Sequence, residues 1–420
     1  MVYIPVEKKI RLDAHNDVLM KLIQHSHEQH RCFFDNRDQY LEVHWSALKE
    51  SQINACFYAA FTPGFGSTAE NQQLINRQFA ALLHLEELAS HIGAPFRKYT
   101  GGSLHPGQKN DFQHWAIQTI EGAYSIDSEN ALGLIDQYAD MGVKAIALVW
   151  NHGNSLGGGT QSSLDLTPLG RLVIEKMEQR RILVDVSHMN NHTFWSTVKA
   201  STKPLIASHS GAYEITPHVR NLDDLQLKAI ADTGGVINVV FHRAFVGDPT
   251  TASIEDVADH IMYICHLIGP EHVGIGSDFD GCDAPIDLEH IGKLNSLDRL
   301  LKRRGLRLRQ RNGILGNNLA RLLMQDAPDQ HAGVKGAPKV DIRAIHHSIT
   351  DITTDYEIRY TLNEPCEPRF WIDGIEKKLM RIAAHTYVIR VTKEQLEGYH
   401  LISITWGSEN QQRKTTLINF

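Results

Sequence analysis

Short runs of apolar, largely β-branched residues recur along the first three quarters of the chain, and stretches with helical patterns separate them. Eight runs are predicted to be buried strands, at residues 9–14, 53–61, 116–122, 143–151, 181–188, 204–211, 234–241 and 272–278. Continuous apolar strands of this kind are typical of a parallel sheet that is buried on both faces. The pattern therefore predicts an α/β fold.

The segments between the runs carry helix-start and helix-stop signals. Thr167 is a predicted N-cap, and Pro168 follows it at the first helical position. Ser253 and Asp256 form a capping-box pair before a helix that should end at Gly269. Eight strand–helix units over roughly 320 residues match a (β/α)8 TIM barrel, which usually needs ~250 residues and often carries insertions. The longest spacings follow the first two runs, so we expect the insertions there.

The pattern changes near the end of the barrel region. Residues 327–337 are rich in Ala, Gly and Pro and are predicted to be a linker. Residues 338–420 alternate, or nearly alternate, between apolar and polar positions, with turn signals between them. We therefore predict a barrel domain over 1–326 and a small all-β, sandwich-like domain over 338–420. Trp371 and Trp406 are assigned to the core of that domain rather than to a binding surface.

Composition and charge exclude several classes of function. The chain has 420 residues, of which 42% are hydrophobic and 22% charged, as in ordinary globular proteins. The net charge of −7 shows no excess of basic residues, which argues against a nucleic-acid partner. The five cysteines are scattered without a C-x-x-C pair, as expected of reduced thiols. Because no signal core, spanning segment or lipid-anchor signal is evident, we expect a cytoplasmic protein without membrane association.

Polar residues follow the same end of successive predicted strands, which is where a TIM barrel carries its chemistry. They are His15, Asp17, Glu121, Asn151, His152, His188, His209 and Asp278. His15 and Asp17 are two positions apart, a spacing that would turn both toward one side of an extended segment. Each residue taken alone is most simply a cap or a loop hydrogen-bond partner. Their joint placement at one rim instead favours a shared site.

Six of these residues, three histidines and three carboxylates, form a donor set for metal ions. Imidazole and carboxylate are ordinary zinc ligands, and six of them exceed the need of one tetrahedral ion. Two ions about 3.5–4 Å apart would use them all if one carboxylate bridged. Such a pair can hold a hydroxide at neutral pH and polarise a carbonyl, so the predicted reaction class is metal-assisted hydrolysis. No H-E-x-x-H, G-x-S-x-G or Walker motif offers a competing chemistry.

The motifs, taken as an ordered set, resemble those of the renal (membrane) dipeptidase family of dinuclear zinc peptidases, and of its bacterial branch in particular. They read DAHNDVL, TIEGA, LVWNHGNSLGGG, VDVSHMN, ASHSGA, HVRNLDD and HVGIGSDFDG, and lie in order from about residue 10 to 326. Each motif is modest alone, whereas the set is highly specific. The family has a (β/α)8 barrel, in agreement with the strand count. The C-terminal β domain lies outside the resemblance.

The resemblance implies two zinc ions per chain, held by His15, Asp17, Glu121 and Asp278 on one side and by Glu121, His188 and His209 on the other. Glu121 would bridge the two ions. Arg220, in HVRNLDD, would bind the C-terminal carboxylate of the substrate, for which a planar guanidinium is well shaped. Asp278 would also carry the proton from the attacking water to the leaving amine.

Two positions depart from the animal enzymes of the family. Asn151 stands where they carry a histidine, and His152 follows it. Either residue could donate a hydrogen bond to the tetrahedral oxyanion. Because neighbours in a strand face opposite ways, we favour Asn151 as the residue that contacts substrate. Val240 stands where the animal enzymes tend to have an aromatic residue, so we expect a different side-chain pocket.

We therefore predict a zinc-dependent dipeptidase whose partner is a small peptide and whose substrates include dipeptides with a C-terminal D-residue. A homodimer is left open. Two alternatives also stay open. The first is a dinuclear-zinc hydrolase of another amide, a lactam or an N-acyl amino acid in specialised metabolism. The second is a catalytically inactive barrel that serves as a scaffold for a binding β domain.

Overall fold

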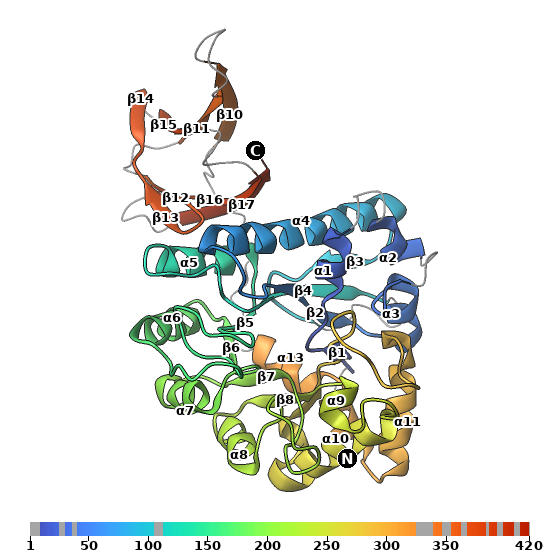
Figure 1. The fold of residues 1–420 in the computed structure, drawn as a ribbon. Coiled ribbons are helices and arrows are strands. Elements are labelled where there is room, and N and C mark those ends of the chain that lie inside the picture. The colour runs from blue at the N-terminus through green and yellow to red at the C-terminus, as the bar shows by residue number, and fades with distance from the viewer. Residues whose placement is uncertain are drawn as a thin grey trace, which may run out of the picture.

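The computed structural model describes residues 9–24, 30–35, 40–104, 112–324, 339–346, 354–362, 368–383, 386–392, 398–406 and 412–419. Figure 1 shows a helix-covered barrel with a smaller β domain packed beside α4 and α5. None of the described helices is long and apolar enough to cross a membrane. Within the described residues the cysteines are free thiols, at Cys32, Cys56, Cys265 and Cys282.

The apolar runs form the barrel strands. These are β1 (Leu12–Asp13), β2 (Ala55–Phe61), β4 (His114–Glu121), β5 (Ala145–Ala147), β6 (Leu183–Asp185), β7 (Ile206–Ser210), β8 (Val236–Val239) and β9 (Val273–Ile275). They pair in parallel in that order. A 2.9 Å hydrogen bond from Ala14 N to Ile275 O and a parallel bridge between Asn16 and Phe279 bring the two edges together. The predicted TIM-like barrel is thereby confirmed.

Several strands are shorter than the apolar runs that predicted them. β1 ends at Asp13, so His15 and Asp17 lie beyond it, on either side of the bridge between Asn16 and Phe279. β5 likewise ends before Asn151 and His152. The expectation that strand alternation separates Asn151 from His152 was therefore wrong, because neither residue lies in a strand. The runs overshoot because the turns at this end of the barrel are themselves buried.

A further strand, β3 (Phe96–Lys98), pairs with β4 outside the barrel path and was not predicted. Its three residues include Arg97 and Lys98 and give no apolar run. The insertions lie where the spacing placed them. After β1 come α1 (Val18–Ile23), α2 (Cys32–Asp35) and α3 (Trp45–Ser51), and after β2 comes α4 (Thr68–Ile92).

The remaining barrel helices are α5 (Ala131–Met141), α6 (Pro168–Gln179), α7 (Asn191–Ala200), α8 (Asp224–Asp232), α9 (Arg243–Val246), α10 (Ile254–Ile268), α11 (Leu294–Arg303), α12 (Leu308–Ile314) and α13 (Asn317–Met324). The predicted caps are present: Thr167 accepts from the Gly170 N–H, and Ser253 and Asp256 form a capping box. Between α12 and α13 lies Gly316, whose φ is 157°.

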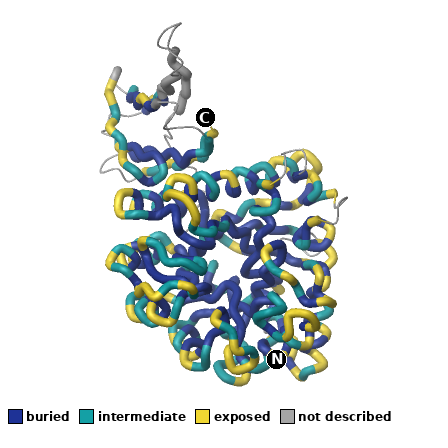
Figure 2. Tube along the Cα trace, in the orientation of Figure 1, coloured by how far each residue is buried: buried dark blue, intermediate teal, exposed yellow. Residues whose placement is uncertain are grey.

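Two apolar layers hold the barrel together, and Figure 2 shows the buried strands at its centre. Because side chains alternate along a strand, one set fills the barrel interior and the other packs under the helices. In β2, Phe57 belongs to the inner cluster, whereas Cys56 and Tyr58 belong to the outer one. Leu319 and Leu322 of α13 join the inner cluster. The interior is thus filled by side chains, and the open space of the barrel lies at its other end.

The β domain consists of two antiparallel sheets. One has the order β10 (Lys339–His346), β11 (Thr354–Thr361), β15 (Thr386–Thr392), β14 (Met380–Ala383), and the other β13 (Ile375–Lys377), β12 (Arg369–Ile372), β16 (Tyr399–Trp406), β17 (Gln412–Asn419). Ile358 and Phe370, from different sheets, share one buried cluster with Trp406, as expected of a sandwich. Trp371 is also buried. The predicted linker 327–337 lies outside the described residues, and the domain boundaries stay predictions.

The β domain docks on α4 and α5, on the outer surface of the barrel. Gln137 of α5 donates to Leu401 O at 3.0 Å and to Ser403 Oγ at 2.7 Å. Arg413 Nε lies 2.6 Å from an Asp140 oxygen. None of the described residues of this domain lines the cavity described below. The domain therefore does not cover the rim of the barrel through any described residue.

Candidate active site

A cavity of about 640 Å³ opens at the carboxyl ends of the barrel strands. This volume lies in the range of small-molecule sites, ~300–1,000 Å³. Seven of the nine residues singled out from the sequence line it: Asp17, Glu121, Asn151, His188, His209, Arg220 and Asp278. His15 is 2% exposed and does not reach the cavity surface. The side chains scattered over the sequence thus converge at one rim.

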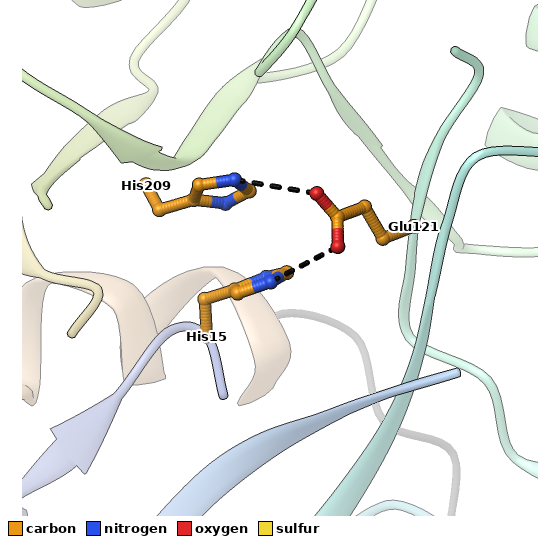
Figure 3. A group of neighbouring side chains, drawn as sticks. All are labelled: His15, Glu121 and His209. Atoms are coloured by element: carbon orange, nitrogen blue, oxygen red, sulfur yellow. Dashed lines mark ion pairs between the residues drawn. The ribbon is translucent and has the colours of Figure 1, made fainter. Parts of the chain in front are cut away.

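Glu121, the last residue of β4, stands at the centre of the group. Its Oε1 lies 2.8 Å from His188 Nε2 and 3.4 Å from His209 Nε2. Its Oε2 lies 3.3 Å from His15 Nε2. Figure 3 shows the two carboxylate oxygens directed at His209 and His15. Each oxygen therefore faces a different set of imidazole nitrogens.

Two more carboxylates gather around His15. Its Nε2 lies 3.6 Å from Asp17 Oδ2 and 3.8 Å from Asp278 Oδ1. The ligand atoms of His15, Asp17 and Asp278 lie within 4.8 Å of one another, as do those of His15, Glu121 and His209. Asp17 Oδ1 and His15 Nε2 are buried and make no hydrogen bond within the described residues. Buried, converging and unpaired donor atoms of these types fit one or two divalent cations.

The outer nitrogens of two imidazoles are held by neighbouring side chains. His188 Nδ1 lies 3.0 Å from Asn151 Oδ1, and His209 Nδ1 lies 2.8 Å from Ser208 Oγ. Because an amide oxygen only accepts, the His188 proton is on Nδ1 and the Nε2 lone pair faces Glu121. Histidines that bind metals almost always make an outer contact of this kind. Sequence reasoning missed Ser208 and this contact of Asn151.

The backbone is strained at the same rim. His188, Asp278 and Asp280 have φ values of 67°, 63° and 68°, in the left-handed region. Such conformations cost ~1–3 kcal/mol each and tend to cluster at functional sites. Gly281 lines the cavity, and a Cβ there would lie 2.0 Å from Asp17 Oδ2. The SDFDG motif therefore contains two aspartates with a strained backbone. Its glycine, Gly281, leaves room for the Asp17 carboxylate because it has no side chain.

Electrostatics keep two of the imidazoles neutral. Burial and the charge of Arg220 lower the pKa of His188 to about 4. Burial and the charge of His15 lower the pKa of His209 well below its usual value. Neutral imidazole is the form that binds a metal ion.

The carboxylates are crowded. Burial and the charge of Glu121 raise the pKa of Asp17. Burial, together with the charges of Asp17 and Glu121, raises the pKa of Asp278 well above its usual value. Against the effect of burial, the charge of His15 lowers the pKa of Glu121 well below its usual value, so the protein's own charges favour the ionised form of Glu121 but not those of Asp17 and Asp278. Divalent cations would favour the ionised form of all three, because a bound ion is the largest local charge in such a site.

Arg220 closes one side of the cavity and is 5% exposed. Its Nη2 donates to His209 O at 3.0 Å, and its guanidinium carbon lies 5.7 Å from the Phe245 ring centroid. Its Nε has no hydrogen-bond partner within the described residues. A fixed, buried guanidinium of this kind is suited to a carboxylate ligand.

The structure separates Asn151 from His152. Asn151 lines the cavity, whereas His152 does not. The His152 ring lies 5.5 Å from the Phe65 ring. Val240 is fully buried in the apolar layer under the helices and does not line the cavity. Val240 therefore does not contact the cavity, and the expected difference in the side-chain pocket stays a prediction.

Comparison with known sequences gives a family match over most of the chain. The family described as membrane dipeptidase (peptidase family M19) matches residues 5–332. A Klebsiella pneumoniae protein, described as an uncharacterized protein in the pqqA 5' region, is 34% identical over 251 residues, 57% of this chain and 92% of that protein. The uncharacterized dipeptidase C965.12 of Schizosaccharomyces pombe is 35% identical over 214 residues, 48% of this chain and 51% of its own length.

Two solved structures share the fold. The dipeptidase AC, a metallopeptidase of family M19, matches with a TM-score of 0.69 at 24% identity, over 76% of this chain and 98% of its own. A metallopeptidase from Rhodobacter sphaeroides, bound to a phosphinate mimic of the dipeptide L-Ala-D-Ala, matches with a TM-score of 0.69 at 23% identity, over 76% of this chain and 99% of its own. The part of the chain that these structures leave uncovered is about the size of the β domain.

Proposed function

Because this chain belongs to the membrane dipeptidase family, peptidase family M19, and is a metallo-dipeptidase, we propose that it hydrolyses dipeptides with two zinc ions. The observation that carries the proposal is the position of Glu121, whose two oxygens face different imidazoles. His15, Asp17 and Asp278 would hold one ion with Glu121. His188 and His209 would hold the other. Two bound zinc ions would supply a nucleophile at neutral pH and polarise the scissile carbonyl.

The chain's own residues divide the remaining work. Arg220 binds the C-terminal carboxylate of the substrate and thereby excludes peptide bonds inside longer chains. Asp278, next to the reacting group, takes the proton of the attacking water and gives it to the leaving amine. Asn151 fixes the His188 ring through Oδ1, and its amide nitrogen faces the substrate carbonyl as an oxyanion donor.

Dipeptides with a C-terminal D-residue belong to the proposed substrates. A fold relative binds a phosphinate mimic of L-Ala-D-Ala. The cavity of about 640 Å³ lies in the volume range of small-molecule sites, ~300–1,000 Å³. The cytoplasmic location and the homodimer stay predictions from the sequence.

Hydrolysis of a dipeptide panel by the zinc-loaded full chain tests the proposal. The panel contains L-Ala-L-Ala, L-Ala-D-Ala, their C-terminal amides and N-acetyl-alanine. We expect turnover of the free dipeptides and loss of turnover for the amides, because the amides leave Arg220 without a carboxylate. Turnover of N-acetyl-alanine without turnover of any dipeptide would instead establish the hydrolase of N-acyl amino acids.

A further inference from the structure

A wall of three stacked aromatic rings stands beside Arg220 in the cavity. The Phe245 ring is nearly parallel to the imidazole of His218, at a centroid distance of 4.3 Å and 28°, and to that of His242, at 4.1 Å and 24°. The phenyl ring is therefore stacked between the two imidazoles. All three side chains line the cavity together with Arg220. We call His218, Phe245 and His242 the stacked wall.

The two imidazoles of the stacked wall are hydrogen-bond donors. His218 Nδ1 accepts from the Arg220 backbone N–H at 3.2 Å, and His242 Nδ1 accepts from the Ala244 backbone N–H at 3.2 Å. A neutral imidazole that accepts at Nδ1 carries its proton on Nε2. Burial lowers the pKa of both rings, which favours this neutral form. Neither Nε2 atom bonds to another described residue, and neither is fully buried. Both Nε2–H groups can therefore donate to a ligand.

The protein supplies no carboxylate for these donors within its described residues. The acids that line the cavity are Asp17, Glu121, Asp278 and Asp280. The first three form the cluster around His15, and Asp280 lies 2.9 Å from Lys21 Nζ. Asp283, whose charge acts on His242, lies 4.0 Å from Arg243 and does not line the cavity. The end of the cavity near Arg220 is therefore rich in donors and poor in acceptors.

We propose that the stacked wall binds a second carboxylate, on the side chain of the substrate's C-terminal residue, beside the one bound by Arg220. This proposal rests on the dipeptidase function proposed above. The enzyme then prefers dipeptides that end in Asp or Glu over those that end in Asn or Gln. A carboxylate offers acceptors to both N–H groups, whereas a primary amide brings donors of its own against them. An aromatic side chain gains less here, because imidazoles already cover the faces of Phe245.

Matched substrates test this preference. The zinc-loaded full chain is assayed with Ala-Asp and Ala-Asn, each with an L- and a D-residue at the C-terminus. We expect kcat/KM for the better Asp isomer to exceed that of its Asn counterpart at least about tenfold, because hydrogen bonds to a charged carboxylate are stronger than those to a neutral amide. His218→Phe and His242→Phe keep a stacked ring and remove one donor each, so each lowers this ratio. His266→Phe, at an exposed position on α10, is the control and leaves the ratio unchanged.

The outcomes separate the two proposals. If wild-type enzyme cleaves Ala-Asp and Ala-Asn equally well, the stacked wall does not bind a carboxylate, while the dipeptidase function stands. If it cleaves neither of them but does cleave the alanine dipeptides, the stacked wall does not bind a carboxylate, while the dipeptidase function stands. If it cleaves none of these dipeptides, the dipeptidase function fails, and calorimetric titration of free aspartate and asparagine then tests the stacked wall. Tighter binding of aspartate, weakened in His218→Phe, supports the wall. Equal binding of the two amino acids overturns it.

Discussion

The rim of the barrel and its junction with the β domain both bury polar side chains of the same types. At the junction, His400 Nδ1 lies 2.6 Å from Asp373 Oδ2, and Asn76 donates to Tyr399 O at 2.7 Å. At the rim, Asp17, Glu121 and Asp278 instead crowd around His15, at 3.3–3.8 Å.

The difference teaches how to tell a structural polar cluster from a catalytic one. At the junction, His400, Asp373 and Asn76 find their partners inside the chain, so these groups require no bound ion to stabilise them. The rim places carboxylates beside carboxylates and leaves Asp17 Oδ1 without a partner among the described residues. Such a cluster is stabilised by what it binds. Variants in the two regions should therefore fail in different ways, with loss of activity at the rim and loss of stability at the junction.

The largest effect is expected for Glu121→Gln. The amide keeps the shape of the side chain but cannot offer two anionic oxygens to the two imidazole sets. We expect kcat/KM for dipeptides to fall by about 10³-fold or more, equivalent to ~4 kcal/mol of transition-state stabilisation. Glu175→Gln, at an exposed position on α6, is the matched control. Activity of Glu121→Gln within tenfold of wild type would show that the rim is not organised around this carboxylate.

A smaller loss is expected for Asn151→Ala. It removes the acceptor at 3.0 Å from His188 Nδ1, and loss of such outer contacts typically lowers metal affinity or activity by ~10–100-fold. His152→Ala, which changes the neighbouring side chain outside the cavity lining, is the comparison variant. Steady-state kinetics and zinc titration of both variants decide which residue serves the site. A larger loss in His152→Ala than in Asn151→Ala would reverse our assignment.

The smallest effect on activity is expected at the junction. Gln137→Ala removes the donors to Leu401 O and Ser403 Oγ, and each lost hydrogen bond lowers stability by ~0.5–1.5 kcal/mol. Both acceptors keep a second partner, the Asp373 backbone N–H and Thr415 Oγ1. Thermal denaturation should show a lower Tm, with kcat/KM per folded molecule unchanged. Gln179→Ala, which removes an exposed contact to Glu175, should leave Tm nearly unchanged. A variant of Gln137 that keeps its Tm but loses activity would mean that the junction acts on the site.

Much of the fold could be predicted from the sequence because its signals are local. Apolar runs and caps such as Thr167 and the Ser253–Asp256 pair are visible in short windows, and they located the strands and helices. The three-residue strand β3 was not predictable in this way, because its pairing with β4 alone makes it a strand. The ends of the strands could not be predicted in this way either, because the turns that follow them are also buried.

The candidate site was predictable in its members but not in its geometry. His15, Glu121 and Asp278 are recognisable because they follow apolar runs within motifs that come in a fixed order. The left-handed backbone of Asp278 has no local signal in the sequence, since it depends on contacts between segments far apart in the chain. The stacked wall was likewise missed, because it joins residues from the turn at 218 and from around α9.

The most direct test of the account is the zinc content of the full chain after loading with zinc and removal of the free metal, measured together with protein concentration by mass spectrometry. We predict about two ions per chain, held by the Glu121 cluster, and a lower content in Asp17→Ala with the fold retained. A fully active wild-type enzyme with one ion or none, or an Asp17→Ala variant with full zinc and full activity, would contradict the account.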